Sequence, residues 1–553
     1  MRTNPLLAID FYKADHISQY PEGTTKVYSN FTPRSNKRFK GSKSYDGKVV
    51  VHGIQKFLKS YLIEDFNELF FNKPKEEVVG KYKRFMDNTL GEDAIDVKHI
   101  EALHDLGYLP LEIRAIPEGS RIPCKIPVLT ITNTEPEFFW LPNYIETVLS
   151  TELWKPITNA TIAYEYKRTF IKYAELTGAS LEFVPFQGHD FSARGLANKE
   201  DAYNSGTGHL LSFVGTDTCL AIEAAEDYLN ANIEEELVGT SIKAYEHSSA
   251  TSSILNISKR ENCDLGHAEY LNLKDVITRI YPSGFVSYVA DSFDFWRVIS
   301  EIALKLKPEI LARDGKLVFR PDSGNPVDII CGFKYIERDE VESIFHSNIY
   351  YDITKGYCTK DVNGNIRQIT DIYEYSEGGL RSFELGDRVL SEAEVKGAVQ
   401  VLWETFGGTT NEKGFKELDS HVGLIYGDSI TLERQEEILR KLMEKGFASS
   451  NIVLGIGSYT YQFSTRDTLG LAMKATYIEV EDGPLEIYKD PATDDGTKKS
   501  AKGLLRVDLV DDEYILREQV TLEEAQGGEL KRVFIDSMLE NETSLKEIRA
   551  RLS

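Results

Sequence analysis

A pattern repeated through the middle of the chain constrains the fold more than any other feature. Short apolar runs end in polar loops that contain Gly or Asp, and helical sequence commonly follows them. The runs are Leu181–Phe186, Phe213–Asp217, Thr240–Tyr245, Phe285–Val289, Leu317–Phe319, Val422–Tyr426 and Ile452–Leu454. Strands that alternate with helices are typical of parallel sheets, and this number of units predicts an irregular β/α barrel. The polar loops would then share the face at the carboxyl ends of the strands, where such folds bind ligands.

The segments on either side of this pattern indicate a second domain. Residues 1–150 contain isolated strand-like runs between helical stretches, which is typical of an α+β domain. Residues 151–470 would form the barrel, interrupted at about 338–418 by a polar, tyrosine-rich insertion with a hairpin signal at Val362–Asn365. Residues 471–553 alternate again and would return to the first domain. We therefore expect an α/β fold, with a barrel domain and an α+β sandwich formed by the N- and C-terminal segments.

The composition limits the classes of partner. The formal charge is -24, from 64 basic and 88 acidic residues, which argues against a nucleic-acid or anionic-membrane partner. No apolar run reaches the roughly 20 residues of a membrane-spanning helix, and the start lacks a signal-peptide core, so we expect a cytoplasmic protein. Five scattered cysteines and ten histidines form no Cys-x-x-Cys or His-Glu-x-x-His motif, so neither a disulfide framework nor a metal motif is predicted.

Three loops of the barrel pattern carry candidate groups for a phosphate-rich ligand. Arg320–Pro326 fixes an arginine and an aspartate at the end of an apolar run, although an ordinary turn with a surface ion pair has a similar sequence. Gly427–Ser429 and Gly455–Ser458 follow the last two runs, where glycine amides commonly bind phosphate. Such glycines can also serve turns alone. Arg194 and Arg466 add positive charge, and together these groups favour a phosphate-rich ligand.

Three further residues each have a structural and a chemical interpretation. Asp217 stands where a helix would begin, so it is either an N-cap or a ligand-binding carboxylate. Phe191 lies in a predicted loop, where an aromatic side chain either fills the core or offers a stacking surface. His247, between Glu246 and Ser248, is either a structural or a reactive histidine. The residues alone leave these alternatives open.

An ordered series of motifs resembles the nicotinamide phosphoribosyltransferase family, which belongs to the type II phosphoribosyltransferases. The resemblance runs from about residue 5 to the C-terminal region, except for the 338–418 insertion. Its motifs are Asp10-x-Tyr12-Lys13-x-x-His16-x-x-Gln19-Tyr20-Pro21, Trp154–Thr158, His189-Asp190-Phe191-x-x-Arg194-Gly195, Gly215–Thr218, Glu246–Ser248, Asp291–Asp294, Arg320–Pro326, Gly427–Asp428 and Thr465–Asp467. The chain departs from the family at Gly457-Ser458-Tyr459, where a longer glycine run is expected, and at Ala290, where a serine is expected.

The resemblance implies a reaction in NAD biosynthesis by pyridine nucleotide salvage. Nicotinamide and phosphoribosyl pyrophosphate would give nicotinamide mononucleotide and pyrophosphate, with Mg²⁺ as cofactor and ATP as a co-substrate that phosphorylates His247. A homodimer with shared active sites is also implied. Because the pyridine nitrogen is already a neutral nucleophile, the site would act by positioning and by stabilising the departing charge. A nicotinate phosphoribosyltransferase is the nearest alternative. The strand-end arginines argue against an acidic-barrel glycosidase. The intact set of Arg194, Asp217, His247, Arg320 and Asp322 argues against a non-catalytic interaction protein.

The resemblance also implies roles for individual residues. The catalytic residues would be His247, Asp322 and Arg320, and Arg194 would join Arg320 and His247 in holding pyrophosphate. The ribose and its 5′-phosphate would be held by Asp322, Gly427, Asp428, Gly457, Ser458 and Arg466. Phe191 and the partner subunit's Tyr12 would enclose the nicotinamide ring, while Asp217 would accept a hydrogen bond from the carboxamide and repel nicotinate. Arg34, Lys474 and Lys489 would line the phosphate channel.

Overall fold

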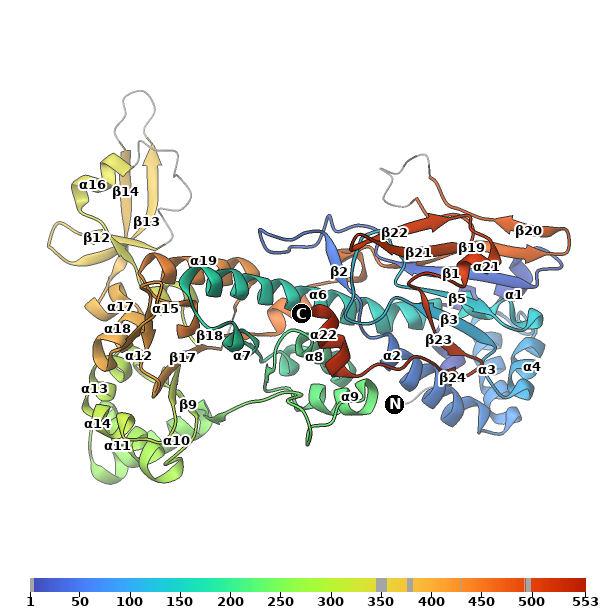
Figure 1. Cartoon of the computed structure of the whole chain (residues 1–553). Helices are drawn as coiled ribbons and strands as arrows, with labels where there is room; N and C mark the ends of the chain where they lie inside the picture. The colour runs from blue at the N-terminus through green and yellow to red at the C-terminus, as the bar shows by residue number, and fades with distance from the viewer. Residues whose placement is uncertain (1–3, 345–355, 375–380, 428, 492, 494–498) are drawn as a thin grey trace.

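The protein has two lobes at opposite ends of one long helix, α6 (Glu146–Thr177) (Figure 1). The computed structural model describes residues 4–344, 356–374, 381–427, 429–491, 493 and 499–553. Helix α6 ends where Gly178 adopts a left-handed conformation, which suits a residue without a Cβ atom. Among the described residues, no helix combines the length and apolar character needed to cross a membrane.

One lobe is a sandwich built from both ends of the chain. Its seven-stranded antiparallel sheet has the order β20-β19-β1-β5-β3-β23-β24. These strands are β1 (Lys26–Thr32), β3 (Leu111–Ala115), β5 (Leu129–Asn133), β19 (Ala472–Val480), β20 (Gly483–Glu486), β23 (Lys531–Ile535) and β24 (Met538–Leu539). The sheet therefore interleaves N- and C-terminal strands, as the sequence predicts.

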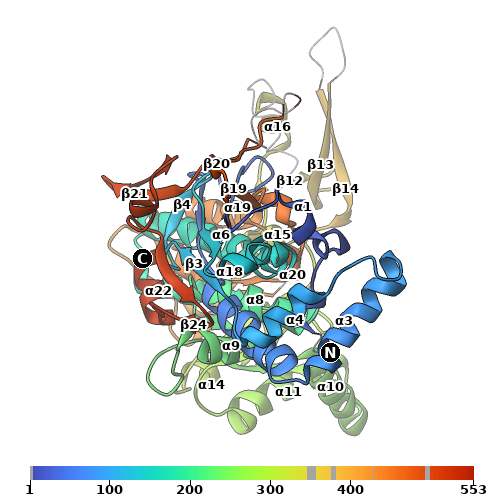
Figure 2. The same ribbon diagram turned by 90° about the vertical axis from the view of Figure 1, so that its right-hand side faces the viewer.

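Other elements cover the two faces of this sheet. The hairpin β21 (Leu505–Val510) and β22 (Glu513–Glu518) lies on one side, while α3 (Lys75–Leu90) and α4 (Lys98–Leu106) lie on the other (Figure 2). Under the hairpin, Leu505 packs in a small apolar cluster with Tyr28 of β1 and Tyr477 of β19. Because burial of apolar side chains drives this packing, the C-terminal segment stabilises the N-terminal strands.

The other lobe is built around a curved parallel sheet, whose strands have the order β7-β6-β18-β17-β10-β9-β8. Its strands are β6 (Gly188–Asp190), β7 (Gly215–Thr216), β8 (Lys243–Tyr245), β9 (Val286–Val289), β10 (Leu317–Arg320), β17 (Val422–Tyr426) and β18 (Val453–Ile456). All neighbouring strands pair in parallel, and an isolated parallel bridge from Gly215 to Thr240 links the two edges. The sheet thus curves into an irregular barrel, and the predicted α/β fold class is confirmed.

The first predicted barrel strand is in the wrong place. Residues Leu181–Phe183 form a 3₁₀ turn and Val184–Gln187 form helix α7, so strand β6 begins only at Gly188. A short apolar run fits a buried helix as well as a strand. Pro185 decides between them, because it has no N–H for a strand ladder but suits the first turn of a helix.

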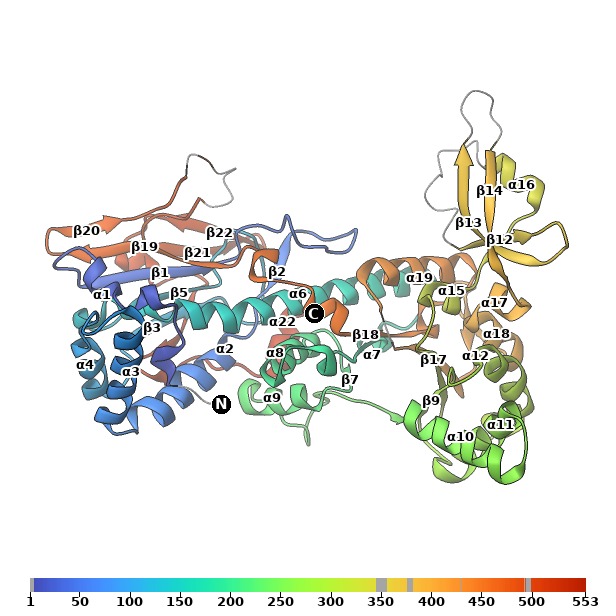
Figure 3. The same cartoon turned by 180° about the vertical axis from the view of Figure 1, so that it is seen from behind.

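The predicted insertion divides into two parts. The strands β11 (Lys334–Tyr335), β12 (Tyr357–Lys360), β13 (Ile366–Glu374) and β14 (Arg381–Val389) form a small sheet that projects from the barrel lobe (Figure 1, Figure 3). The predicted hairpin at Val362–Asn365 is confirmed, because it joins the antiparallel pair β12 and β13. Helix α18 (Ala398–Phe406), in contrast, buries Val399 and Leu402 in the main core. The β appendage is therefore shorter than the predicted insertion.

Candidate active site

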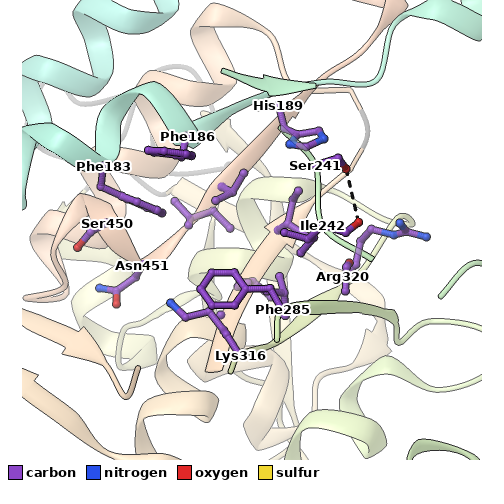
Figure 4. A pocket seen from close by; sticks show the side chains of 18 of the residues that line it. Phe183, Phe186, His189, Ser241, Ile242, Phe285, Lys316, Arg320, Ser450 and Asn451 are labelled. Carbon is purple, nitrogen blue, oxygen red and sulfur yellow. Dashed lines mark hydrogen bonds between the residues drawn. The ribbon is translucent and has the colours of Figure 1, made fainter. Parts of the chain in front are cut away.

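A cavity of about 410 Å³ runs through the inside of the barrel. Its walls are mainly apolar and come from strands, including Val318, Leu424 and Ile425. Figure 4 shows His189, Ser241 and Arg320 on one side of the cavity and Phe183 and Phe186 on the other. A largely apolar cavity with a few converging polar groups at the strand ends is the usual form of a small-molecule site in such folds.

Asp217 projects into this cavity and is held by two neighbours. His189 Nε2 lies 2.9 Å from Asp217 Oδ1, and the Ser241 hydroxyl donates a hydrogen bond to the same oxygen. Burial alone would raise the pKa of Asp217, but the hydrogen bonds from His189 and Ser241 lower it below its ordinary value. Asp217 is therefore a carboxylate at neutral pH.

The structure also decides between the two interpretations of Asp217. Helix α9 (Cys219–Leu229) has Thr218 at its N-cap position, and no side-chain cap bond is made there. The carboxylate of Asp217 instead bonds side chains from neighbouring strand ends. The N-cap interpretation is thus excluded, and Asp217 is available to a ligand.

Phe191 lines the same cavity as Asp217. Its ring centroid is 4.5 Å from that of His189, with 34° between the ring planes. A Cβ atom at Gly455 would lie 2.8 Å from Phe191 Cδ2, so only a glycine of β18 allows the ring this position. Phe191 therefore presents part of its ring to the cavity, and its role as a stacking residue stays a prediction.

Charged residues gather at the carboxyl ends of β8 and β10. His247 is the first residue of α10 (His247–Glu261), and its Nε2 lies 3.5 Å from Asp291 Oδ1 and 3.9 Å from Asp322 Oδ2. Arg320 Nε lies 3.5 Å from Asp322 Oδ2. Asp291 Oδ2 accepts hydrogen bonds from the Asp322 amide at 2.9 Å and the Ser323 hydroxyl at 2.7 Å, which fixes the loop after β10. The three predicted catalytic residues are thus brought together.

The remaining loops of this face also converge. A Cβ atom at Gly427 would lie 2.3 Å from Asp322 Oδ1, and one at Gly195 would lie 2.1 Å from Ser458 Oγ. The loop after β17 therefore packs directly against Asp322, and the loop with Arg194 packs against the start of α20 (Ser458–Gln462). Gly457 immediately precedes this helix. The predicted site residue Asp428 lies outside the described residues.

The other predicted site residues lie outside the barrel cavity. Arg34 and Lys474 line a separate cavity of about 270 Å³ in the sandwich lobe, together with Lys125 and Lys499. Burial lowers the pKa of Lys474, and the charges of Arg34, Lys489 and Lys13 lower it further. The cavity is therefore cationic on balance, with four basic side chains in its lining against one acidic side chain, Glu518.

Tyr12 and Arg466 form a second group away from the barrel cavity. The Tyr12 side chain is 62% exposed. Burial and the charges of Asp10 and Glu146 raise the pKa of Tyr12, whereas the charge of Arg466 opposes the increase. Tyr12 therefore lies near Arg466 and the start of α6, and one chain does not bring it next to Phe191.

Sequence reasoning assigned no role to three side chains of the site, His189, Ser241 and Asp291. His189 and Phe191 are two residues apart at the end of a strand, where alternate residues share a face, so this spacing could have paired them. Ser241 lies within a predicted strand run and Asp291 follows another, but only the fold shows that Ser241 contacts Asp217 and that Asp291 contacts the loop after β10.

Comparisons with known proteins agree with this geometry. Residues 186–537 match the model of the Nicotinate phosphoribosyltransferase (NAPRTase) family, and residues 4–113 match that of the Nicotinamide phosphoribosyltransferase N-terminal domain. The chain is 50% identical to the nicotinamide phosphoribosyltransferase of Acinetobacter baylyi over 100% of this chain and 97% of that protein. It is 31% identical to the nicotinamide phosphoribosyltransferase of Mycoplasma pneumoniae, over 90% of this chain and 94% of that protein. It is 29% identical to the nicotinamide phosphoribosyltransferase of Xanthomonas campestris pv. campestris, over 99% of this chain and 97% of that protein. The chain therefore belongs to the NAPRTase family of enzymes and, within it, to the nicotinamide phosphoribosyltransferases, the group that its motifs resemble.

Proposed function

We propose that the protein is a nicotinamide phosphoribosyltransferase of NAD salvage. It would transfer phosphoribosyl from phosphoribosyl pyrophosphate to nicotinamide and release pyrophosphate, in the cytoplasm. The observation that carries the proposal is that the Asp217 carboxylate and the Phe191 ring line the same barrel cavity and that His189 contacts both. A carboxylate accepts a hydrogen bond from a carboxamide NH₂ group and repels the carboxylate of nicotinate. The name of the 50% identical relative supports the same choice of base.

The strand-end charges would act on the other substrate. Arg194, Arg320 and His247 would hold the pyrophosphate group, and the side chain of Arg320 is only 11% exposed. Fixed positive groups in a partly dehydrated site stabilise charge on a leaving group better than water does. Phe191 would hold the pyridine ring in line with the ribose carbon, and its face also favours the pyridinium cation of the product.

A magnesium ion fits the residues around Asp322. In the described part of the chain, no three His, Cys, Asp or Glu side chains are arranged to hold a metal by themselves. Mg²⁺ in phosphate-transfer sites usually takes one or two carboxylates and completes its coordination with substrate phosphates. Asp291 Oδ1 is buried and lacks a hydrogen-bond partner among the described residues, and Asp322 is adjacent. These two residues would hold the ion, which would neutralise pyrophosphate charge.

The proposal includes coupling to ATP through His247. The histidine is at the N-terminus of the 15-residue helix α10, where backbone amides and the helix dipole favour a phosphoryl group. Its side chain is 46% exposed, so the γ-phosphate of ATP can reach the ring. The neighbouring carboxylates of Asp291 and Asp322 favour a defined ring orientation.

The proposal also includes a homodimer with shared active sites. Tyr12 and the cationic cavity of Arg34 and Lys474 belong to the sandwich lobe, at the opposite end of α6 from the barrel lobe (Figure 1). Two chains in antiparallel association would place the sandwich lobe of each beside the barrel cavity of the other. The exposed aromatic side chains of Tyr459 and Phe463 next to Ser458 support a covered surface at this place.

The base preference tests the proposal directly. Initial rates with nicotinamide and with nicotinate would be compared at saturating phosphoribosyl pyrophosphate, and pyrophosphate release would be measured with and without nicotinamide. We expect nicotinamide to be preferred by at least about 100-fold, because juxtaposed like charges cost several kcal/mol. A preference for nicotinate would favour the alternative, a nicotinate phosphoribosyltransferase, and would refute the role of Asp217.

A further inference from the structure

We propose that His189 and Ser241 are positioning residues that determine the choice of base, because together they fix the orientation of the Asp217 carboxylate. The inference rests on the proposed function, since it specifies how the same site distinguishes nicotinamide from nicotinate. Neither residue needs to touch the reacting atoms. Both act through Asp217, and this distinguishes them from the catalytic residues at the ends of β8 and β10.

The three side chains come from three different strand ends. His189 is in β6, Asp217 follows β7, and Ser241 precedes β8. All three line the barrel cavity. The bridge between Gly215 and Thr240 holds β7 beside the segment that carries Ser241, so the contact depends on closure of the barrel.

The hydrogen bonds leave one oxygen of Asp217 for a ligand. A carboxylate only accepts hydrogen bonds, so His189 must donate from Nε2 and Ser241 must donate its hydroxyl proton. Both donors bond Oδ1. Among the described residues, both hydrogen bonds to this carboxylate therefore use Oδ1, and Oδ2 keeps its lone pairs. Asp217 Oδ2 therefore offers a hydrogen-bond acceptor, which suits the NH₂ group of a carboxamide and not a carboxylate.

The His189 ring is itself held in place. One face packs on Phe191, with ring centroids 4.5 Å apart. On another side the backbone of Gly215 is so close that a Cβ atom there would lie 2.9 Å from His189 Nδ1. The His189 ring is only 10% exposed, whereas the side chain of Asp217 is 40% exposed, and its two hydrogen-bond donors restrict its orientation. His189 thus supports the stacking surface and the hydrogen-bond acceptor at once.

The test measures kcat and KM for both bases in three variants, His189→Leu, His189→Gln and Ser241→Ala. We expect His189→Leu to lower kcat/KM for nicotinamide about 10- to 100-fold, mainly through KM, as loss of a hydrogen bond to a charged group does. The KM for phosphoribosyl pyrophosphate should change less than about twofold, since its contacts are elsewhere. His189→Gln should keep most of the selectivity, because its amide NH₂ can donate to Asp217. Ser241→Ala should lower selectivity in the same direction.

A double-mutant cycle separates positioning from a general structural role. If His189 acts through Asp217, then His189→Leu should change the base preference of the Asp217→Asn variant by less than about twofold. The matched control is His421→Leu, which breaks another His–Asp contact of the barrel lobe, 2.8 Å from Nδ1 to Asp419 Oδ1, and should leave base preference unchanged.

Two results would overturn the inference. One is an unchanged preference for nicotinamide in folded His189→Leu and Ser241→Ala enzymes, and the other is additive effects of His189→Leu and Asp217→Asn. If His189→Leu does not fold, Ser241→Ala and His189→Gln still decide the question. A wild-type enzyme that uses neither base would refute the proposed function instead.

Discussion

The contact between Gly195 and Ser458 gives a prediction with a magnitude that follows from the structure. A Cβ atom at Gly195 would lie 2.1 Å from Ser458 Oγ and 2.5 Å from Ser458 Cβ, whereas ordinary contacts begin at 3.4 Å. Gly195→Ala therefore forces the 3₁₀ turn Ala193–Gly195 and helix α20 apart by about 1 Å, since neither is a free chain end. Overpacking of this kind costs about 1–3 kcal/mol of stability.

The same displacement should affect the reaction, because the two elements carry Arg194 and Ser458. A shift of about 1 Å in a substrate-positioning group costs up to about 100-fold in rate. We expect Gly195→Ala to lower kcat/KM for phosphoribosyl pyrophosphate by up to about 100-fold and to change the KM for nicotinamide much less. Steady-state kinetics with each substrate varied in turn, together with thermal unfolding, would measure both effects.

A second substitution makes this reasoning refutable. Ser458→Gly removes both clashing atoms, so Gly195→Ala combined with Ser458→Gly should match the unfolding temperature and kinetics of Ser458→Gly alone. Gly80→Ala is the control, because a Cβ atom there meets nothing within 4 Å, in the middle of α3. If the double variant is as impaired as Gly195→Ala, the proposed clash does not explain the effect.

Three other predictions concern ATP, the dimer and pH. His247→Ala should abolish stimulation by ATP while leaving a basal rate, and unchanged stimulation would refute the phosphohistidine. Tyr12→Ala and Phe191→Ala should each be inactive, but co-expression should restore about one quarter of wild-type activity, because half of the dimers then hold one complete site; no restoration would contradict shared sites. Glu118→Gln should lower the unfolding temperature near neutral pH, since the buried carboxylate accepts bonds from His52 and two backbone amides. Burial raises the pKa of Glu118, but these bonds lower it below its ordinary value. Their stabilisation is therefore lost as the pH falls and the carboxylate is protonated. The difference in unfolding temperature between Glu118→Gln and the wild type should shrink below about pH 4.

The sequence predicted the elements of the barrel lobe well where local chemistry decides them. Leu317–Phe319 and Val422–Tyr426 are apolar runs bounded by turn residues, and both form buried parallel strands. Leu181–Phe186 has the same local character but forms helical turns, because Pro185 suits a helix start. Helix α18 was missed inside a polar segment, since its apolar side chains have a partner only once the barrel is built.

In the site, too, some features follow from the local sequence and others only from the tertiary structure. By itself the sequence determined the repeated strand-and-loop pattern, the family, and the residue types at the strand ends, because these depend on neighbours along the chain. Only the tertiary structure decided that Asp217 bonds His189 and Ser241 rather than capping a helix, and that Tyr12 and Lys474 belong to the opposite lobe from Phe191. Those facts depend on which strand ends become neighbours when the sheet curves, and that is fixed by packing across long sequence separations.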